Sequence, residues 1–383
     1  MSSVRRPRDG RGWEARYRDG AGRQRSKSFR TKREAERFLE RVGTDLQRGD
    51  WVDPGLQRVT FEDWAKEWRR TIVHLERNTI AFYDSMLKVH VLPVLGRWPI
   101  GSIDQAVVRR FIAELVASGA GARLVHGALQ TVRHVATTAQ GAGALRANPC
   151  DGVKVPRLPR REAVFLTPAQ ILDLAQAIRQ PYGMLITFAA YSGLRAGEIG
   201  GLRVGRLNLL KGDVDVLESL KDTAGSLHFG ATKNHLRRTV RLPRFLADEL
   251  GAYLNGRPSQ PQDLVFTAPD GGPLRHNLFY RRTFKPAAAA AGLPDELRFH
   301  DLRHTCAALL IAGGAHPRAI MERLGHSTIT VTLNTYGHLF PTLDAALADG
   351  LDATYRESVA SAARTPTTST VVHHLAVDGT QHG

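Results

Sequence analysis

The sequence of 383 residues contains only two cysteines, Cys150 and Cys306, which lie far apart. Two distant thiols build neither a disulfide framework nor a Cys-rich zinc site, so their scarcity excludes both and favours a reducing compartment. Cys306 lies in an apolar segment, where we expect a small buried residue and not a nucleophile.

Long hydrophobic runs are also missing. No stretch approaches the roughly 18 apolar residues that a membrane-spanning helix requires. The first thirteen residues are rich in Arg and have no apolar core, so we expect no signal peptide. These absences favour a soluble, intracellular protein.

Acidic residues are few relative to basic ones. The chain has 37 Asp and Glu against 53 Lys and Arg, a formal net charge of +16 and a pI near 10.4. Such an excess, dominated by arginine, usually marks a polyanionic partner. A generally basic proteome or a ribosome-associated protein is the alternative, because net charge indicates partners and not fold.

Residues 1–50 predict a small hairpin followed by a helix. Alternating stretches at 13–17 and 24–29 flank turn residues, and Thr31 with Glu34 predicts a helix start that continues to about Val42. We expect this polycation to contact DNA, although a solvated charged face is the alternative. The only acidic residues among the first 30 are Asp9, Glu14 and Asp19. The basic residues are Arg5, Arg6, Arg8, Arg11, Arg16, Arg18, Arg23, Arg25, Lys27 and Arg30.

Helical patterns dominate the next hundred residues. Phe61, Trp64, Ala65 and Trp68 recur at helical spacing, and further helices are predicted at about 78–89, 104–118 and 122–139. No strand pattern interrupts them. They therefore predict a small all-α domain that closes near Asn148-Pro149, before a Pro- and Arg-rich linker.

A mixed pattern starts at Phe165. Thr167 with Gln170 predicts a capping box, and helices are expected through Ile178 and over 181–191. Extended segments follow at about 214–217, 227–232 and 237–242, and helices dominate again to about Glu357. The remaining residues are polar and low in aromatics, so we expect a disordered tail.

Three separated motifs carry the chemistry, and the first is Gly193-Leu-Arg195-Ala-Gly-Glu198. Gly193 is expected to end one helix and Arg195 to start the next, which aims a guanidinium and free backbone N–H groups at one anion. Glu198, one turn later, can hold the Arg195 side chain in place without contacting the anion itself. A helix-capping ion pair is the alternative interpretation.

The second motif is His300-Asp-Leu-Arg303-His304. His300 and Arg303 are three residues apart and share a helix face. His300 and His304 also have an i, i+4 spacing that suits zinc, but the intervening Glu of a zinc protease and an obvious third ligand are missing. We therefore expect no metal, and we expect His304 to be a structural hydrogen-bonding residue.

The third motif is Leu324-Gly325-His326, followed ten residues later by Tyr336. Gly325 is expected to end a helix, and the next helix can bring Tyr336 back beside His326. A lone tyrosine is usually a core or surface residue. A phenol is nevertheless a suitable nucleophile for phosphodiester exchange, because with a pKa of about 10 it leaves more readily than an alcohol.

Taken together, the order and spacing of these motifs closely resemble the tyrosine recombinases, the phage integrase family. The resemblance covers about residues 163–340 and implies a mainly α fold with small β-sheets (α+β). It also implies an arm-type DNA-binding domain at 1–52, less specifically matched, a helical core-DNA-binding (SAM-like) domain at 58–156, and a catalytic domain at 163–357. Residues 358–383 remain as the disordered tail.

The resemblance also implies a role for each residue. Arg195 and Arg303 would clamp the scissile phosphate, and Tyr336 would attack it to form a 3′-phosphotyrosine. His300 would bind the phosphate or help deprotonate the tyrosine, and His326 would donate to a non-bridging oxygen. Lys233 fits the family's leaving-group acid better than Lys221, while Glu198 supports the site. Arm contacts are expected from Arg16, Arg18, Arg25 and Lys27.

The expected function is site-specific DNA integration and excision for a phage or mobile element. Alternatives are a chromosome-dimer resolvase, a topoisomerase of type IB and a non-catalytic DNA-binding regulator. The arm-like region counts against the first two, and the complete catalytic set counts against the third. We expect no cofactor, metal or ATP, because two guanidiniums and a lysine can replace a metal ion.

The resemblance further implies the partners. These are double-stranded attachment-site DNA, a homotetramer assembled on it, and two accessory proteins, a host DNA-bending protein and an excision directionality factor. Cytoplasmic localisation at a bacterial nucleoid follows from the same expectation.

Overall fold

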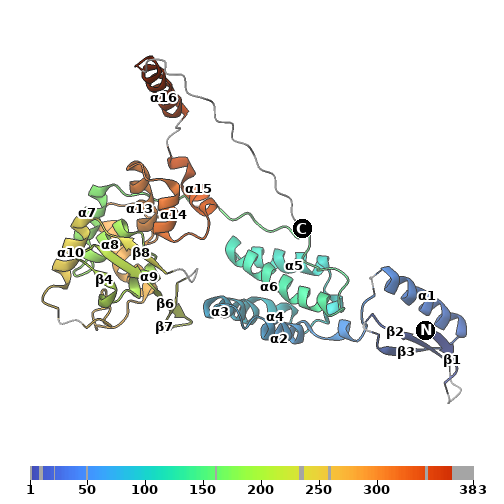
Figure 1. Ribbon diagram of the computed structural model, residues 1–383. Helices are drawn as coiled ribbons and strands as arrows, with labels where there is room; N and C mark the ends of the chain where they lie inside the picture. The colour runs from blue at the N-terminus through green and yellow to red at the C-terminus, as the bar shows by residue number, and fades with distance from the viewer. Residues whose placement is uncertain are drawn as a thin grey trace. The chain divides into compact units, whose positions relative to one another are not determined.

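The computed structural model describes residues 2–7, 12–20, 22–48, 51–159, 162–232, 237–257, 260–340 and 344–364. It divides into two compact units, which we treat separately: Met1–Glu162 with Lys221–His228, and Ala163–Leu220 with Phe229–Gly383. Helices predominate and the sheets are small and antiparallel (Figure 1), which confirms the predicted α+β class. No helix among the described residues is long and apolar enough to cross a membrane.

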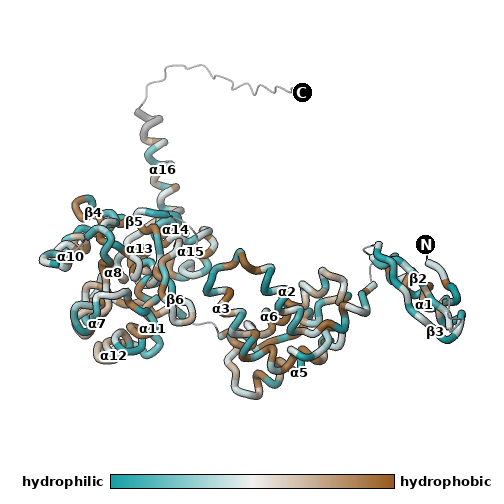
Figure 2. Tube along the Cα trace, turned by 90° about the horizontal axis from the view of Figure 1, so that it is seen from below, coloured by the Kyte–Doolittle hydropathy of each residue, from teal (hydrophilic) through white to brown (hydrophobic). Residues whose placement is uncertain are grey.

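The first unit begins with a three-stranded antiparallel sheet and one helix. Its elements are β1 (Ser3–Arg5), β2 (Trp13–Arg18), β3 (Gln24–Phe29) and α1 (Lys32–Arg48). The predicted hairpin is confirmed by the pairing of β2 with β3, and β1 adds a third strand to it. Ala15 and Tyr17 are buried, and the Tyr17 ring meets Phe38 of α1 edge to face. The segment is largely hydrophilic elsewhere (Figure 2).

Five helices follow in the first unit: α2 (Phe61–Thr71), α3 (Arg77–Met86), α4 (Leu92–Leu95), α5 (Gln105–Ala117) and α6 (Ala122–Gly141). The apolar stripe read from the sequence is buried, with Trp64 7% and Trp68 4% exposed. Thr60 caps α2 by accepting from the Asp63 backbone N–H. The division of this unit into arm and core-binding domains stays a prediction.

The second unit starts with three helices, α7 (Pro168–Ala177), α8 (Gly183–Ser192) and α9 (Ala196–Gly200). The predicted capping box is present, because Thr167 and Gln170 exchange side-chain and backbone hydrogen bonds. Two small sheets come next along the chain, one in the order β4-β5-β8 and one of β6 and β7, of which residues 221–228 belong to the first unit. Their strands are β4 (Leu207–Asn208), β5 (Asp213–Val216), β6 (Glu218–Thr223), β7 (Ser226–Ala231) and β8 (Arg238–Arg241).

The chain then returns to helices: α10 (Arg244–Leu254), α11 (His276–Phe279), α12 (Lys285–Ala290), α13 (Asp301–Ala312), α14 (Pro317–Leu324), α15 (Ile329–Tyr336) and α16 (Asp344–Arg364). We expected disorder from residue 358, but residues 358–364 continue α16, since alanine favours helix. The rest of the expected tail lies outside the described residues.

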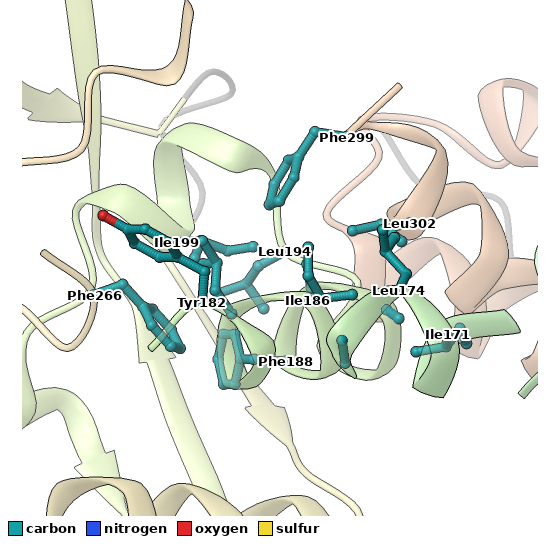
Figure 3. Close-up of a cluster of buried hydrophobic side chains, with 14 of the residues drawn as sticks. Ile171, Leu174, Tyr182, Ile186, Phe188, Leu194, Ile199, Phe266, Phe299 and Leu302 are labelled. Carbon is teal, nitrogen blue, oxygen red and sulfur yellow. The ribbon is translucent and has the colours of Figure 1, made fainter. Parts of the chain in front are cut away.

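An apolar cluster surrounds α8 and supports residues of the first two motifs (Figure 3). Leu194, which precedes Arg195, is 2% exposed in this cluster. Phe299, which precedes His300, is 5% exposed, and Leu302, which precedes Arg303, is 0% exposed. The hydrophobic core therefore fixes the backbone on which two of the three motifs are placed.

Candidate active site

The last turn of α14 gathers three arginines. Consecutive carbonyl oxygens accept from them: Arg323 O from Arg238 Nε at 3.0 Å, Leu324 O from Arg303 Nη2 at 2.6 Å and Gly325 O from Arg195 Nη2 at 2.8 Å. The final carbonyls of a helix lack partners within the helix and carry its negative dipole end. The helix end therefore draws cations from α9, β8 and α13 to one place.

Glycine makes this arrangement possible at Gly325. It adopts the left-handed conformation, with φ of 65°, and ends α14 as predicted. A Cβ at this position would lie 3.0 Å from Nη1 of Arg238. A larger residue would therefore both strain the backbone and displace the arginine.

Glu198 is the counter-charge to this cluster. Its side chain is 1% exposed and accepts from Arg195 at 2.8 Å and from Arg238 at 2.8 and 3.0 Å. Burial alone raises the pKa of the carboxyl, but the hydrogen bonds and charge of Arg238, followed by those of Arg195, outweigh it and lower the pKa to about 2. The predicted support of Arg195 by Glu198 is thus present in the geometry.

Arg303 is the most enclosed of the three cations. It is 3% exposed, and besides Leu324 it donates to the Gly193 carbonyl at 2.6 Å. Burial and the nearby Arg195 charge lower its pKa to about 10, so it remains a cation at neutral pH. Three guanidiniums against one carboxylate leave a positive site that suits a phosphate.

His326 and His300 border the cluster as neutral imidazoles. His326 Nδ1 bonds Thr332 Oγ1 at 2.9 Å, which fixes the ring and leaves Nε2 for another partner. Burial, then the charges of Arg303 and Arg195, lower the pKa of His326 to about 4. Desolvation, His304 and Arg303 lower the pKa of His300 to about 4 as well, although part of this residue is exposed to solvent.

Tyr336 returns beside His326, as the spacing predicted. The two rings are nearly parallel, with centroids 6.3 Å apart and planes 11° apart. The tyrosine is 1% exposed, and burial raises the pKa of its hydroxyl to about 12. That hydroxyl lies 2.8 Å from Nδ1 of His304. His304 is therefore a hydrogen-bonding residue, as expected, but its partner is the candidate nucleophile.

Two features of the site were not read from the sequence, and one predicted residue is not described. Arg238 looked like an ordinary residue of an alternating strand, and the contact between His304 and Tyr336 had no signal in the spacing. Lys233 lies outside the described residues, just before β8, whereas Lys221 lies within β6.

The arm residues divide into paired and open cations. Arg25 is paired with Asp19 at 3.0 Å and with Asp53, and Arg16 with Glu14 at 3.2 Å. Arg18 and Lys27 are exposed, although Arg18 donates to the Gly22 carbonyl and the Lys27 ammonium lies 5.0 Å from the Phe38 ring centre. Arg18 and Lys27 are thus the more available for a phosphate.

Comparison with known proteins identifies the family. Residues 164–342 match the model of the phage integrase family, and residues 60–116 match the N-terminal SAM-like domain of phage integrases. The prophage phiRv2 integrase of Mycobacterium tuberculosis is 28% identical over 90% of this chain and 93% of its own length. The ICEBs1 integrase of Bacillus subtilis is 28% identical over 70% of this chain and 75% of its own.

Solved structures share the fold at low identity. The Tn1549 transposon integrase, solved with a circular-intermediate DNA, superposes with a TM-score of 0.66 at 20% identity, covering 77% of this chain and 99% of that one. A lambda integrase dimer bound to a core site gives 0.57 at 17%, covering 87% and 93%. The chain therefore belongs to the phage integrase family of tyrosine recombinases, and it is a site-specific recombinase, an enzyme that breaks and rejoins DNA.

Proposed function

We propose that this recombinase integrates and excises a phage or other mobile element through a 3′-phosphotyrosine on Tyr336. The observation that carries the proposal is the convergence of Arg195, Arg303, His326 and Tyr336 around the end of α14. Each cation is held by the protein before any DNA arrives, so little reorganisation is needed when charge develops on the phosphate.

In this mechanism the two arginines hold the scissile phosphate. Each donates two N–H groups to the protein, and a guanidinium has five, so donors remain for the non-bridging oxygens. His326 donates its Nε2–H to one of these oxygens, and His300 hydrogen-bonds the phosphate or assists the tyrosine. The phosphate in turn offsets the unbalanced positive charge of the site.

Tyr336 attacks phosphorus while the 5′-oxygen departs with a proton from Lys233. The phosphotyrosine retains the free energy of the phosphodiester, so a second strand's 5′-hydroxyl can reverse the step without ATP. Positioned guanidiniums supply the stabilisation that a metal ion would otherwise give, so the reaction needs neither cofactor nor metal. Tyr336 is buried in the structure described, and it must become accessible before it attacks.

The partners follow from the same proposal. Double-stranded attachment sites are the substrate, with Arg18 and Lys27 among the arm contacts. A homotetramer is the assembly, since a lambda integrase, similar in fold, was solved as a tetramer on a Holliday junction. A host DNA-bending protein and an excision directionality factor are further partners of the proposed reaction.

A nicked suicide duplex tests the nucleophile. It carries the core site read from the junctions of the integrated element, and its short 5′-hydroxyl strand diffuses away after cleavage. Wild-type protein should form a covalent complex that survives denaturing electrophoresis, and Tyr336→Phe should form none. Tyr253→Phe on α10 is the matched control. Covalent DNA on Tyr336→Phe would show that another residue attacks.

Replacing the bridging 5′-oxygen by sulfur tests the acid in the same assay. A thiolate leaves without protonation, so the sulfur substrate does not need Lys233. We expect Lys233→Ala to cleave the oxygen substrate about 100-fold or more slowly, as for loss of a general acid, and the sulfur substrate at the wild-type rate. An equal defect on both substrates would assign Lys233 to DNA binding.

A further inference from the structure

The hydroxyl of Tyr336 makes its hydrogen bond with His304, a residue outside the set of expected catalytic residues. His304 Nδ1 lies 2.8 Å from this oxygen, and the two rings meet edge to face with centroids 5.6 Å apart. The bond links α13 to α15. Within the described part of the chain, the buried Tyr336 hydroxyl has His304 as its hydrogen-bond partner.

The other two histidines are not placed to take this proton. His326 faces the tyrosine ring nearly in parallel, and its Nδ1 bonds Thr332. His300 lies next to His304, with ring centroids 5.0 Å apart, but the described residues include no hydrogen bond from it to Tyr336. His304 is thus the imidazole in direct contact with the reacting atom.

The direction of the bond depends on the protonation state of His304 and on its tautomer. Burial lowers the pKa of His304; Asp301 opposes this, while Arg298 and Arg303 add to it, so the ring is neutral at pH 7. With its hydrogen on Nε2, the neutral imidazole accepts a hydrogen bond from the Tyr336 hydroxyl at Nδ1, the arrangement that a proton acceptor needs. The charged and titratable groups near this ring are Arg298, His300, Asp301, Arg303, His326 and Tyr336.

We propose that His304 is a further catalytic residue, which accepts the proton of the Tyr336 hydroxyl as that oxygen attacks the scissile phosphate. The inference rests on the proposed function. In the step the tyrosine O–H bond breaks, the O–P bond forms and the bond from phosphorus to the 5′-oxygen breaks. The phenolic proton moves to His304 Nδ1, and the 5′-oxygen takes a proton from Lys233. In rejoining, His304 returns its proton to the departing phenolate.

An asparagine at position 304 separates proton transfer from hydrogen bonding. Its side-chain oxygen stands near the place of Nδ1 and accepts the same bond, but it takes up no proton near neutral pH. The full-length protein is assayed for single-turnover cleavage of the nicked duplex between pH 6 and pH 10. The variants are His304→Asn and His304→Leu, with His316→Asn as the matched control, since His316 is exposed and asparagine also caps a helix well.

We expect His304→Asn to cleave about 100-fold or more slowly than wild type at pH 7, the usual effect of losing a general base. Its rate should rise about tenfold per pH unit, because hydroxide must then remove the proton. The wild-type rate should be nearly flat over the same range, and His316→Asn should match it. DNA affinity, measured in parallel, should not change. If His304→Asn does not melt cooperatively, His304→Gln replaces it, and the same rise in rate of about tenfold per pH unit is expected.

Two results would overturn the inference. If His304→Asn cleaves at close to the wild-type rate at every pH, the histidine only holds the hydroxyl. If His304→Leu cleaves faster than wild type, the hydrogen bond restrains the nucleophile and does not activate it. Failure of the proposed function is a separate result, because wild type and His316→Asn would then form no covalent complex at all.

Discussion

Removing the positive charge of Arg238 should destabilise the catalytic unit. In Arg238→Met the aliphatic stem is retained, while two hydrogen bonds to Glu198 and one to the Arg323 carbonyl are lost. The side chains of the pair are 10% and 1% exposed, so solvent does not screen the loss. Breaking a buried ion pair costs about 3–5 kcal/mol, and because Arg195 still accompanies Glu198 we expect about 3 kcal/mol.

Urea unfolding can follow the two units separately. All five tryptophans lie in the first unit, at positions 13, 51, 64, 68 and 98, so fluorescence reports on that unit alone. Far-UV circular dichroism reports on both. With a slope of about 3 kcal/mol per molar urea for a unit of this size, the second transition should shift by about 1 M. The fluorescence midpoint should stay unchanged and serves as the internal control.

A double-mutant cycle decides whether the loss belongs to the pair. Glu198→Gln combined with Arg238→Met should cost less than the two single variants together, by about 2 kcal/mol. Arg238→Lys, which keeps a charge but not the paired geometry, should fall between wild type and Arg238→Met. Single variants whose losses add to within about 0.5 kcal/mol, or an Arg238→Met loss below that size, would refute the reasoning.

Two further predictions concern pH and the arm. The pKa values of His300 and His326 in the folded state, about 4, lie below the unfolded value near 6.5. The stability that this difference contributes should therefore be complete above about pH 6.5 and be lost as the pH falls toward 4. His326→Gln should make the melting temperature depend less on pH in this window. Lys27→Ala should weaken DNA binding and reduce its salt dependence by about one phosphate contact. Arg25→Ala should instead lower the melting temperature detected by fluorescence, because Arg25 pairs with two carboxylates. Equal salt slopes for Lys27→Ala and wild type, or an unchanged melting temperature for Arg25→Ala, would contradict these assignments.

Local features of the fold were predictable because they depend on near neighbours. The capping residues Thr31 and Thr167, and the helix ends at Gly193 and Gly325, are where the sequence placed them. These positions have a physical signature within four or five residues, either a side chain that reaches a free N–H or a glycine that tolerates positive φ. Strand β6 carried no such signature, because its polar sequence alternates weakly and pairs only with β7.

The site was predictable to the extent that its residues belong to motifs. Arg195, Arg303, His326 and Tyr336 stand at fixed distances from helix ends, and the structure brings them together. Arg238 stands 40 residues from Glu198 and 85 from Arg323, and no spacing rule links positions so far apart. Such partners are chosen by packing, which the pattern of one sequence does not encode locally.

The same distinction explains why His304 was assigned too small a part. His304 follows Arg303 on α13, so its side chain points to another face of the helix. The sequence of this helix indicates only that His304 can form a hydrogen bond. Its partner comes from α15, 32 residues later, and that partner is the one side chain whose oxygen is proposed to react. A proton acceptor must touch the atom it deprotonates, whereas a phosphate clamp acts through charge and tolerates more distance. Contact at 2.8 Å is therefore stronger evidence for the base than membership of a motif, and it ranks His304 above His300 for that step.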